Sequence, residues 1–389
     1  MAESGIRVLH VGKYYPPVPG GIEQVVRLLC ENERPAIDSR ALVSNTRHTT
    51  IEEVVEGVPV TRLARVGYIG SVGLCPTLPL WLRRLPADVI VVHEPNPIAL
   101  VAVVLARPNT AILVWFHSEV VRPRWKYRLL YRPFLRAVLR RAARIVVSSP
   151  ALAQHALELQ DFQDKCVVVP YGVDRARFAP TARVLARAER IRAEHPGPLI
   201  LFVGRLVPYK GVDVLLRALD GLDATTLLVG DGPLRAALEA QADALGLSRV
   251  RFLGAVPDEE VASLYHAADI FTLPSVTRAE AFGVVQLEAM ACGVPVVSTR
   301  LPSGVPWVNQ HEQTGLVVPP GDATALHEAL ATLLRDPALR NALGRSARAR
   351  VDREFTPERM ARMTGDIYRE VLGRERLVPL PATPQPGPE

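Results

Sequence analysis

The stretch EAFGVVQLEAMACGVPVV, residues 280–297, contains a glycine-bearing turn, an apolar helical pattern and the start of a β-branched run. The glycine of Phe282-Gly283-Val284 precedes apolar residues at helical spacing, so we expect a helix to begin there. The run VPVVST (294–299) is apolar and β-branched, which is typical of a buried strand. A helix followed at once by a buried strand predicts one unit of a parallel sheet with helical connections.

The same alternation extends in both directions along the chain. After residue 198 it appears in LILFVGR (199–205), TTLLVGD (225–231), VRFLGA (250–255) and DIFTLPS (269–275). In the first half it appears in IRVLHVG (6–12), RALVSN (40–45), DVIVVHE (88–94), AILVWFHS (111–118) and ARIVVSS (143–149). We therefore expect an α/β protein of two Rossmann-like, doubly wound domains facing a cleft.

These patterns also predict the domain boundaries. An N-terminal domain is expected over residues 1–175 and a C-terminal domain over 176–356, and 389 residues are enough for two such domains. The amphipathic segment 357–372 is expected to pack back on the first domain. Residues 378–389, VPLPATPQPGPE, hold alternating prolines and almost nothing to bury, so we expect a disordered tail.

Composition limits the class of protein. With 48% hydrophobic and 22% charged residues, the chain is globular in type. Its four cysteines show no CxxC pairing and predict buried free thiols in a reducing cytoplasm. We recognise no signal peptide and no apolar run of about 20 residues, so the expected location is cytoplasmic. The net charge of +6 indicates anionic partners without saying which kind.

Two glutamates in the opening stretch carry candidate chemistry. The free amides of a helix beginning at Phe282, Gly283 and Val284 would attract a diphosphate. Glu280, just before that helix, can face the hydroxyls of a sugar, and Glu288 can accept two hydrogen bonds from ribose hydroxyls. A surface glutamate and an ordinary helix glutamate are the alternative interpretation of this pair.

Two cations stand at the carboxyl end of a predicted strand. In VGRLVPYKG (203–211), Arg205 follows the strand and Lys210 precedes a glycine and a new helix, where cations meet phosphate in an α/β cleft. Solvated loop cations are the alternative. A turn is expected at GDGP (230–233), and Asp322 is expected to cap a helix.

GRLVPYKG, GDGP, EAFGVVQLEAMACGVPVV and TGLVVPPGD occur in the order and spacing of glycosyltransferase family 4, and the chain resembles that family from about residue 6 to about residue 372. The resemblance implies the GT-B fold and a retaining transfer from a nucleotide sugar. It implies that Arg205 and Lys210 bind the donor diphosphate, that Glu280 contacts the transferred sugar and that Glu288 binds the ribose. LPSGVPWVNQ (301–310) departs from the family's Gly-Gly-x-x-Glu segment, which leaves the donor sugar in doubt.

The first half holds two further candidates. Gly20 and Gly21 precede a predicted helix, where backbone amides can meet an oxyanion or an acceptor. His117 ends a predicted strand and is expected to face the cleft. The resemblance implies that the glycines form an active-site loop and that His117 lies near the donor sugar. It also implies that the leaving phosphate helps deprotonate the acceptor, with no metal and no cofactor besides the donor as co-substrate.

A strongly basic segment, RPRWKYRLLYRPFLRAVLRRAAR (122–144), contains nine cations, no acids and interleaved apolar residues. Such a cationic amphipathic pattern can lie on an anionic membrane surface, which would suit a lipid-linked acceptor and a peripheral position on the inner face of the cell membrane. An ordinary packed helix with a basic face is the alternative. Its apolar members are Trp125, Leu129, Leu130, Phe134, Leu135, Val138 and Leu139.

A weaker resemblance to bacterial surface polysaccharide enzymes that transfer mannose or rhamnose makes GDP-mannose the leading donor. UDP-glucose, UDP-N-acetylglucosamine and dTDP-rhamnose stay open. We therefore expect a hexosyltransferase acting in polysaccharide or glycolipid biosynthesis. The alternatives are a soluble glycosyltransferase of a small natural product, a sugar-nucleotide epimerase, and a binding protein that has lost catalysis. A nucleic-acid-binding protein is disfavoured because no recognised module accompanies the basic segment.

Overall fold

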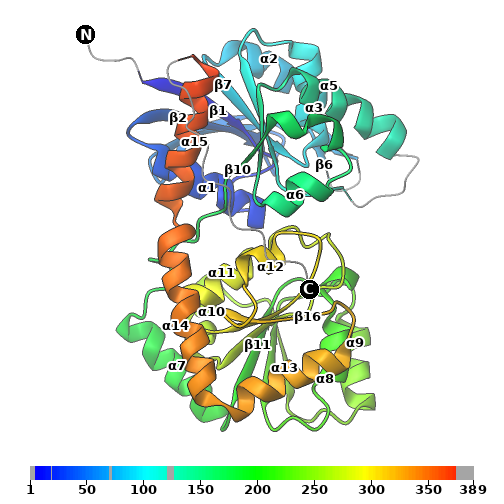
Figure 1. Ribbon diagram of the computed structural model, residues 1–389. Coiled ribbons are helices and arrows are strands. Elements are labelled where there is room, and N and C mark those ends of the chain that lie inside the picture. The colour runs from blue at the N-terminus through cyan, green and yellow to red at the C-terminus, as the bar shows by residue number, and fades with distance from the viewer. Residues whose placement is uncertain (1–4, 19, 70–71, 121–126, 374–389) are drawn as a thin grey trace.

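The chain folds into two lobes, each built around one sheet, and the computed structural model describes residues 5–18, 20–69, 72–120 and 127–373 (Figure 1). The first sheet has the strand order β10-β9-β8-β7-β1-β2-β4-β3, in which only the β3–β4 pair is antiparallel. Its strands are β1 (Ile6–Val11), β2 (Ile37–Ser44), β3 (Ile51–Val55), β4 (Val58–Leu63), β7 (Val89–Glu94), β8 (Ala111–Phe116), β9 (Arg144–Val147) and β10 (Cys166–Val168).

Helices connect these strands, and two of them have side-chain caps. Asn96 and Ser149 cap α3 and α6 through Ala99 N and Leu152 N at 3.2 Å each. The helices of this lobe are α1 (Gly21–Glu33), α2 (Leu78–Arg84), α3 (Pro97–Ala106), the π-helix η1 (Tyr127–Tyr131), α5 (Arg132–Arg141), α6 (Pro150–His155) and the 3₁₀-helix η2 (Gln160–Lys165). A small hairpin pairs β5 (Gly67–Ile69) with β6 (Val72–Leu74).

The second sheet is entirely parallel, with the order β13-β12-β11-β14-β15-β16. Its strands are β11 (Leu199–Val203), β12 (Thr225–Val229), β13 (Val250–Gly254), β14 (Ile270–Leu273), β15 (Val296–Thr299) and β16 (Gly315–Val318). Its helices are α7 (Ala182–Glu194), the 3₁₀-helix η3 (Pro208–Lys210), α8 (Val212–Ala218), α9 (Arg235–Ala244), α10 (Asp258–Ala267), α11 (Val284–Ala291), α12 (Val305–Val308) and α13 (Ala323–Arg335). Asp322 caps α13 by accepting from Ala325 N at 2.9 Å, which confirms the predicted cap.

Two C-terminal helices follow in line. Helix α14 (Pro337–Glu354) covers the second lobe, and α15 (Pro357–Val371) lies along α1 of the first lobe (Figure 1). The Tyr368 hydroxyl of α15 donates to the Glu33 carboxylate of α1 at 2.8 Å. A second link joins Arg144 to Glu370 at 2.5 Å. The end of the described chain is therefore fixed to the lobe in which the chain begins.

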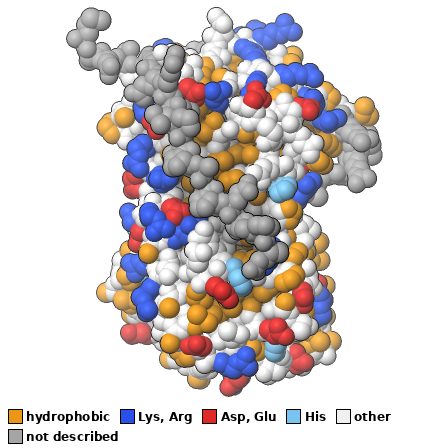
Figure 2. Space-filling model, in the orientation of Figure 1, with side chains coloured by type: hydrophobic (Ala, Val, Ile, Leu, Met, Phe, Trp, Pro, Cys, Tyr) orange, Lys and Arg blue, Asp and Glu red, His pale blue; other side chains and the backbone are white. Residues whose placement is uncertain are grey.

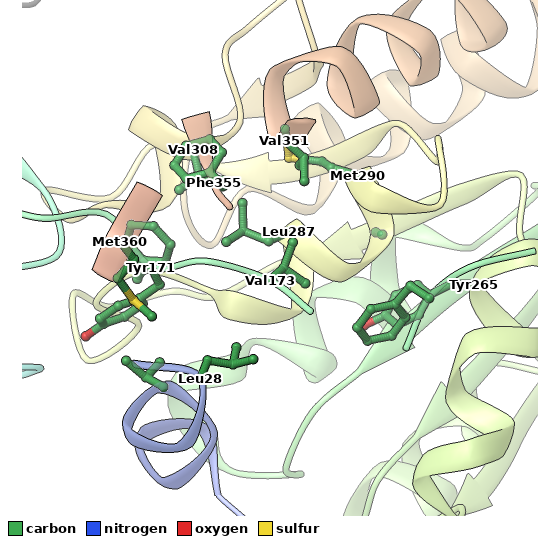
Figure 3. Packing of buried hydrophobic residues seen from close by; sticks show 14 of the residues in the cluster. Leu28, Tyr171, Val173, Tyr265, Leu287, Met290, Val308, Val351, Phe355 and Met360 are labelled. Carbon is green, nitrogen blue, oxygen red and sulfur yellow. The ribbon is translucent and has the colours of Figure 1, made fainter. Parts of the chain in front are cut away.

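One buried cluster of apolar side chains continues from one lobe into the other. Figure 3 shows Leu28 of α1 and Tyr171 near Met360 of α15, while Leu287 of α11 and Phe355 lie further along the same cluster. All five side chains are buried. The buried apolar contacts therefore join the two lobes.

The two parallel sheets confirm the predicted α/β class. Strands β3 and β4 were not predicted. Side chains of β3 are exposed along most of its length, including Ile51 and Val54, because it is an edge strand. Such a strand lacks the continuous apolar run that marks the buried strands of a parallel sheet. Among the described cysteines, Cys30 and Cys75 are buried free thiols, whereas Cys166 and Cys292 are only partly buried.

The surface shows charges of both signs. On the face drawn in Figure 2, the Lys and Arg side chains are interspersed with Asp and Glu over both lobes. Within residues 5–18, 20–69, 72–120 and 127–373, no helix combines the length and apolar character needed to cross a bilayer.

Candidate active site

The strand order of the second sheet creates a crevice. Strands β11 and β14 are neighbours, but the chain leaves β11 for β12 on its other side and leaves β14 for β15. Connections that diverge in this way open a space outside the carboxyl ends of the two strands, which is where open α/β sheets bind ligands. Lys210 lies on the segment that follows β11 and Glu280 on the segment that follows β14. The topology therefore brings these two residues to one point.

Lys210 and Glu280 form a buried ion pair. The Lys210 Nζ lies 2.6 Å from Glu280 Oε2, and the two residues are 7% and 8% exposed. The Ser275 hydroxyl also donates to Glu280 Oε2, at 3.1 Å. Burial alone lowers the pKa of Lys210, but the adjacent Glu280 carboxylate outweighs burial, so the pKa of Lys210 is raised. Lys210 therefore holds a positive charge in a partly desolvated crevice.

A glycine allows this close approach. Gly211 has φ +65°, and a Cβ built on it would lie 2.1 Å from the carbonyl oxygen of Pro274. The backbone after β11 is thus in contact with the backbone after β14. A hydrogen bond of 2.8 Å from Val276 N to Tyr209 O joins the two loops directly. Lys210 is fixed between them.

Helix α11 opens beside the ion pair, as expected from the sequence. Gly283 is its N-cap with φ +73°, and no side chain caps the helix. The first amides of an uncapped helix have no side-chain acceptor and carry the positive end of the helix dipole. Val284, the first helical residue, is half-buried. This end of α11 is suited to an anion such as a diphosphate.

The side chain of Phe282 packs in the core. Its ring meets Tyr171 edge-on at 4.8 Å between centroids and also contacts Trp307 and Phe355. The backbone of Phe282 remains the part able to meet a ligand. Gly304 packs here too, since a Cβ on it would lie 2.9 Å from Phe282 Cδ2.

Arg205 lies at the carboxyl end of β11 with an exposed side chain. Within the part of the chain that the structure describes, it forms no salt bridge. Its charge acts on Tyr209, whose pKa is raised by burial and drawn downward by Lys210 and Arg205. Arg205 is thus the more exposed of the two predicted cations, while Lys210 is held by Glu280.

Glu288 lies on α11, and its carboxylate accepts a hydrogen bond of 2.8 Å from the Tyr265 hydroxyl of α10. Burial raises the pKa of Glu288, and the Tyr265 hydrogen bond and the Arg177 charge act against that rise. Tyr265 was not singled out by the sequence, because its spacing from Glu288 has meaning only once α10 and α11 are packed together.

A groove of about 770 Å³ is lined by residues of α1, α7 and α10. Arg177 and Asp258, both electrostatic neighbours of Glu288, belong to its lining and pair with each other at 3.1 Å. Arg27 of α1 lines the groove from the first lobe. The electrostatic neighbours of Glu288 thus include Lys210 of the crevice as well as Arg177 and Asp258 of the groove.

Gly20 and Gly21 precede and begin α1, at the carboxyl side of β1. Gly21 is exposed and has open space around its Cα, while a Cβ on Gly20 would meet the Glu23 carboxylate. The helix has no side-chain cap, so its first amides resemble those of α11. Burial raises the pKa of Glu23 against the lowering effect of Lys13.

His117 follows β8 and is buried, with 3% exposure. Its Nε2 lies 2.9 Å from His93 Nδ1, and its Nδ1 lies 2.6 Å from the Tyr171 hydroxyl. Both ring nitrogens are therefore engaged inside the protein. Burial lowers the pKa of His117 to about 3, so the ring is neutral. The sequence offered one signal for His93, its position near the end of a buried apolar run.

The basic segment is partly built into the fold. Trp125 and the rest of 121–126 lie outside the described residues. Leu135, Val138 and Leu139 are buried in the core of the first lobe, and Phe134 packs against it. The expectation that all these residues form one membrane-facing surface was therefore wrong for α5, because that helix uses its apolar face to cover the sheet. Leu129 and Leu130 remain exposed, at 68% and 66%.

In the described part of the chain, no three His, Cys, Asp or Glu side chains are placed to hold a metal ion.

Comparisons with known families match both lobes. Residues 187–350 match the model of the glycosyl transferases group 1, and residues 20–172 match the glycosyl transferase 4-like domain. The second match covers Gly20, Gly21 and His117, and the first covers the Lys210 crevice, α11 and Glu288. The two matches together include each predicted site residue.

Two characterised relatives match nearly the full length. D-rhamnosyltransferase WbpZ of Pseudomonas aeruginosa is 37% identical over 90% of this chain and 92% of its own. O-antigen chain mannosyltransferase C of Escherichia coli is 30% identical over 94% of this chain and 99% of its own. Among solved structures, sucrose-phosphate synthase from Thermosynechococcus elongatus has a TM-score of 0.79 and 26% identity, covering 95% of this chain and 100% of that one.

Proposed function

The chain belongs to the group 1, family 4-like glycosyltransferases of GT-B fold, and we propose that it is a retaining enzyme that transfers a hexose from a nucleotide sugar. The favoured donor is GDP-mannose. The proposed acceptor is a lipid-linked glycan in the synthesis of a polysaccharide or glycolipid. Names of the two full-length relatives support this choice, since one is a rhamnosyltransferase and the other an O-antigen mannosyltransferase.

The observation that carries the proposal is the Lys210–Glu280 pair beside the uncapped start of α11. A departing nucleoside diphosphate gains negative charge as the glycosidic bond breaks. A fixed ammonium and free helix amides stabilise that charge without reorganising at the moment of reaction. Arg205, which is exposed nearby on the same loop, would add a second cation on donor binding.

Each remaining site residue has a proposed part. Glu280 would exchange some of its contact with Lys210 for hydroxyls of the transferred sugar. Glu288, held by Tyr265, would accept from the ribose hydroxyls, and the nucleoside would extend into the groove lined by α1, α7 and α10. Gly20 and Gly21 would close over the donor from the first lobe.

Acceptor deprotonation is assigned to the leaving phosphate. His117 has both ring nitrogens engaged in internal contacts, so we assign it to shaping the sugar side of the site and not to proton transfer. The donor is the co-substrate in this proposal, and no step uses a metal ion.

Membrane contact is proposed at the exposed pair Leu129 and Leu130 with the arginines around them. Arg132 begins α5 after the intervening Tyr131, and Arg140 lies in the last turn of that helix. Cations near an apolar projection suit the anionic surface of a cytoplasmic leaflet. The enzyme would then work as a cytoplasmic protein bound peripherally to the inner face of the cell membrane.

A donor screen tests the proposed function. Calorimetry and thermal shift with GDP-mannose, UDP-glucose, UDP-N-acetylglucosamine and dTDP-rhamnose should show selective binding of GDP-mannose. Glu288→Ala should weaken that binding about tenfold or more, since a hydrogen bond to a charged group contributes about 1.5–3 kcal/mol. The matched control is Glu239→Ala, which removes a carboxylate that pairs with Arg235 on α9. Equal binding in both variants would remove Glu288 from the donor site.

The stereochemistry needs a separate measurement. Proton NMR of the anomeric signal of the first-formed product should show the configuration of the donor sugar. An inverted product would contradict the retaining assignment and leave the donor site unaffected. Release of a free rearranged sugar nucleotide without an acceptor would instead indicate an epimerase.

A further inference from the structure

Three histidines from adjacent strands stack inside the first lobe. His10 lies in β1, His93 in β7 and His117 directly after β8, and these strands are neighbours in the sheet. The rings of His10 and His93 are 5.3 Å apart between centroids, and those of His93 and His117 are 5.2 Å apart. Their exposed fractions are 0%, 1% and 3%. The function proposed above uses none of these contacts beyond His117 itself.

The three rings form a continuous chain of hydrogen-bond contacts. His10 Nδ1 lies 3.1 Å from His93 Nε2, and His93 Nδ1 lies 2.9 Å from His117 Nε2. At one end, His10 Nε2 lies 3.0 Å from Glu33 Oε2. At the other end, His117 Nδ1 lies 2.6 Å from the Tyr171 hydroxyl. The chain thus runs from α1 to the segment that enters the second lobe.

At the Glu33 end of the row of histidines, the carboxylate oxygens act as hydrogen-bond acceptors. Besides the contact with His10, the carboxylate accepts from the Ser39 hydroxyl at Oε2 and from the Tyr368 hydroxyl at Oε1, 2.8 Å away. An ionised carboxylate accepts hydrogen bonds and donates none. His10 must therefore direct a ring N–H from Nε2 toward Glu33.

The N–H of His10 fixes the direction of the other hydrogen bonds between the three histidines. A neutral imidazole has one N–H, so His10 Nδ1 is an acceptor and must receive the N–H of His93 Nε2. By the same step, His93 Nδ1 receives the N–H of His117 Nε2. His117 Nδ1 is then an acceptor, and within the described residues its hydrogen-bond contact is the Tyr171 hydroxyl. Every proton in the chain points toward Glu33.

We propose that Glu33 is a positioning residue that fixes the Nε2–H tautomer of His117 through His10 and His93, and so fixes Tyr171 with its hydroxyl donating into the first lobe. The Glu33 carboxylate lies on α1 near α15, at the opposite end of the row of hydrogen-bonded histidines from Tyr171. No role in substrate contact is assigned to it.

The direction of these hydrogen bonds bears on the candidate active site through Tyr171. The Tyr171 ring packs edge-on against Phe282 at 4.8 Å, and Phe282 immediately precedes the N-cap of α11. A Tyr171 hydroxyl held by His117 keeps its ring against Phe282. Glu33 is in this way connected to the helix end that is proposed to hold the diphosphate, and this part of the inference rests on the proposed function.

The His93 and His117 rings are expected to stay neutral around pH 7. Burial lowers the pKa of His93, and the neighbouring His117 and His10 lower it further. Burial also lowers the pKa of His117. A second proton on His93 or His117 would turn an acceptor nitrogen into a donor. The uniform direction of the hydrogen bonds therefore requires both rings to be neutral.

Nitrogen NMR of the full chain labelled with ¹⁵N-histidine tests the tautomers without any activity. The chain has nine histidines, and single His→Gln variants assign the three signals. At pH 7.5 all three rings should show a protonated Nε2 and an unprotonated Nδ1. A protonated Nδ1 on His117, or a doubly protonated His10, would overturn the proposal before any variant of Glu33 is made.

Glu33→Gln tests the cause. An amide offers an NH2 group that donates and a carbonyl oxygen that accepts, so the direction is no longer imposed and a fraction of His117 should carry its proton on Nδ1. Tyr368→Phe is the matched control, since it removes a hydrogen bond from the same carboxylate but leaves its charge. Its tautomers should equal those of the wild type. Unchanged tautomers in Glu33→Gln would overturn the proposal whatever its activity.

The kinetic arm measures release of GDP from GDP-mannose. Glu33→Gln should lower kcat about tenfold with donor KM within about twofold, because misplacement of positioned groups acts on the transition state. Tyr368→Phe should keep kcat within about twofold of the wild type, even where its loss of thermal stability equals that of Glu33→Gln. An equal fall of kcat in both would make Glu33 a structural residue and overturn the positioning role. If the wild type releases no GDP, the proposed function fails while the tautomer measurement still decides the inference.

Discussion

At the scale of single residues, the buried Lys210–Glu280 ion pair holds two opposite charges in a partly desolvated crevice. Removing both charges from water costs several kcal/mol, and a good ion pair returns about that much. The pair is therefore not a source of net stability. A ligand can exploit it because each partner already has a desolvated, fixed position.

Variants of the pair should separate stability from turnover. Lys210→Met leaves Glu280 buried without its cation and should lower the free energy of unfolding by about 3–5 kcal/mol, as breaking a buried pair does. The double variant Lys210→Met/Glu280→Gln should recover most of that loss in urea unfolding. Turnover should stay reduced by about 100-fold or more in both, since the charge on the diphosphate is no longer stabilised. Recovery of turnover together with stability would contradict the assignment of Lys210.

Arg205→Ala should lower turnover by a similar factor of about 100, without a measurable loss of stability, because the side chain is exposed. The matched control is Arg217→Ala on the following helix, an exposed arginine that pairs with Asp213. Steady-state kinetics of the two variants side by side would show whether the position or merely the charge matters.

The buried histidines predict a pH dependence of stability. His117 titrates near 6.5 when unfolded but at about 3 in the folded state. The unfolded chain thus binds more protons between these values, and stability should fall as the pH is lowered from 6.5 toward 3. The slope is about 1.4 kcal/mol per pH unit for each such histidine.

Urea unfolding at pH 7.5, 6.5 and 5.5 would measure that slope. His117→Gln should reduce it by about one histidine's share below pH 6.5. The exposed His155, replaced by Gln, should leave it unchanged. Equal slopes in the wild type and His117→Gln would mean that His117 is not buried in its neutral form.

At the scale of elements, the loops after β11 and β14 meet because of one glycine. Gly211 and Gly221 both have positive φ, +65° and +73°, but only Gly211 has backbone atoms where a Cβ would be. Gly221→Ala should cost about 1–2 kcal/mol for the backbone conformation alone. Gly211→Ala should cost about 1–3 kcal/mol more, because the Pro274 carbonyl must move.

Turnover provides the second readout of this pair of variants. Displacing the loop after β11 moves Lys210, so Gly211→Ala should also lower kcat by at least tenfold. Gly221→Ala should keep the kcat of the wild type. Similar unfolding free energies in the two variants would show that the close approach to Pro274 does not constrain the loop.

At the scale of the whole molecule, the lobes are joined on more than one side. Tyr171 meets Phe282 in the buried cluster, and Arg278 of the second lobe pairs with Glu119 of the first at 2.8 Å. Arg278 also donates to the His155 carbonyl at 3.2 Å. The crevice at β11 and β14 is thus bordered by residues of both lobes, which suits a reaction between two substrates.

The prediction of membrane contact concerns the outer surface of the first lobe. Leu129→Ser/Leu130→Ser should weaken sedimentation with anionic phosphatidylglycerol vesicles at least tenfold and leave GDP release unchanged. Leu80→Ser/Leu105→Ser is the matched control, since these leucines are 64% and 60% exposed on other helices of the same lobe. Equal vesicle binding in the two double variants would place any membrane contact elsewhere.

The sequence alone determined the class of fold, because buried parallel strands must be apolar along their whole length and their glycine-bearing ends stand out. It also determined the start of α11 at Gly283. The edge strand β3 gave no such signal, because its side chains are mostly exposed and the apolar run of a buried strand is absent there.

Only the tertiary structure decided which partners these residues have. Lys210 and Glu280 meet because β11 and β14 are adjacent at the switch point, and Tyr265 reaches Glu288 because α10 packs near α11. The histidine chain exists because β1, β7 and β8 are neighbours in space, an order that local periodicity does not encode. Residue type and spacing set what each segment can become, whereas hydrogen bonds and ion pairs between distant segments depend on how the strands are ordered.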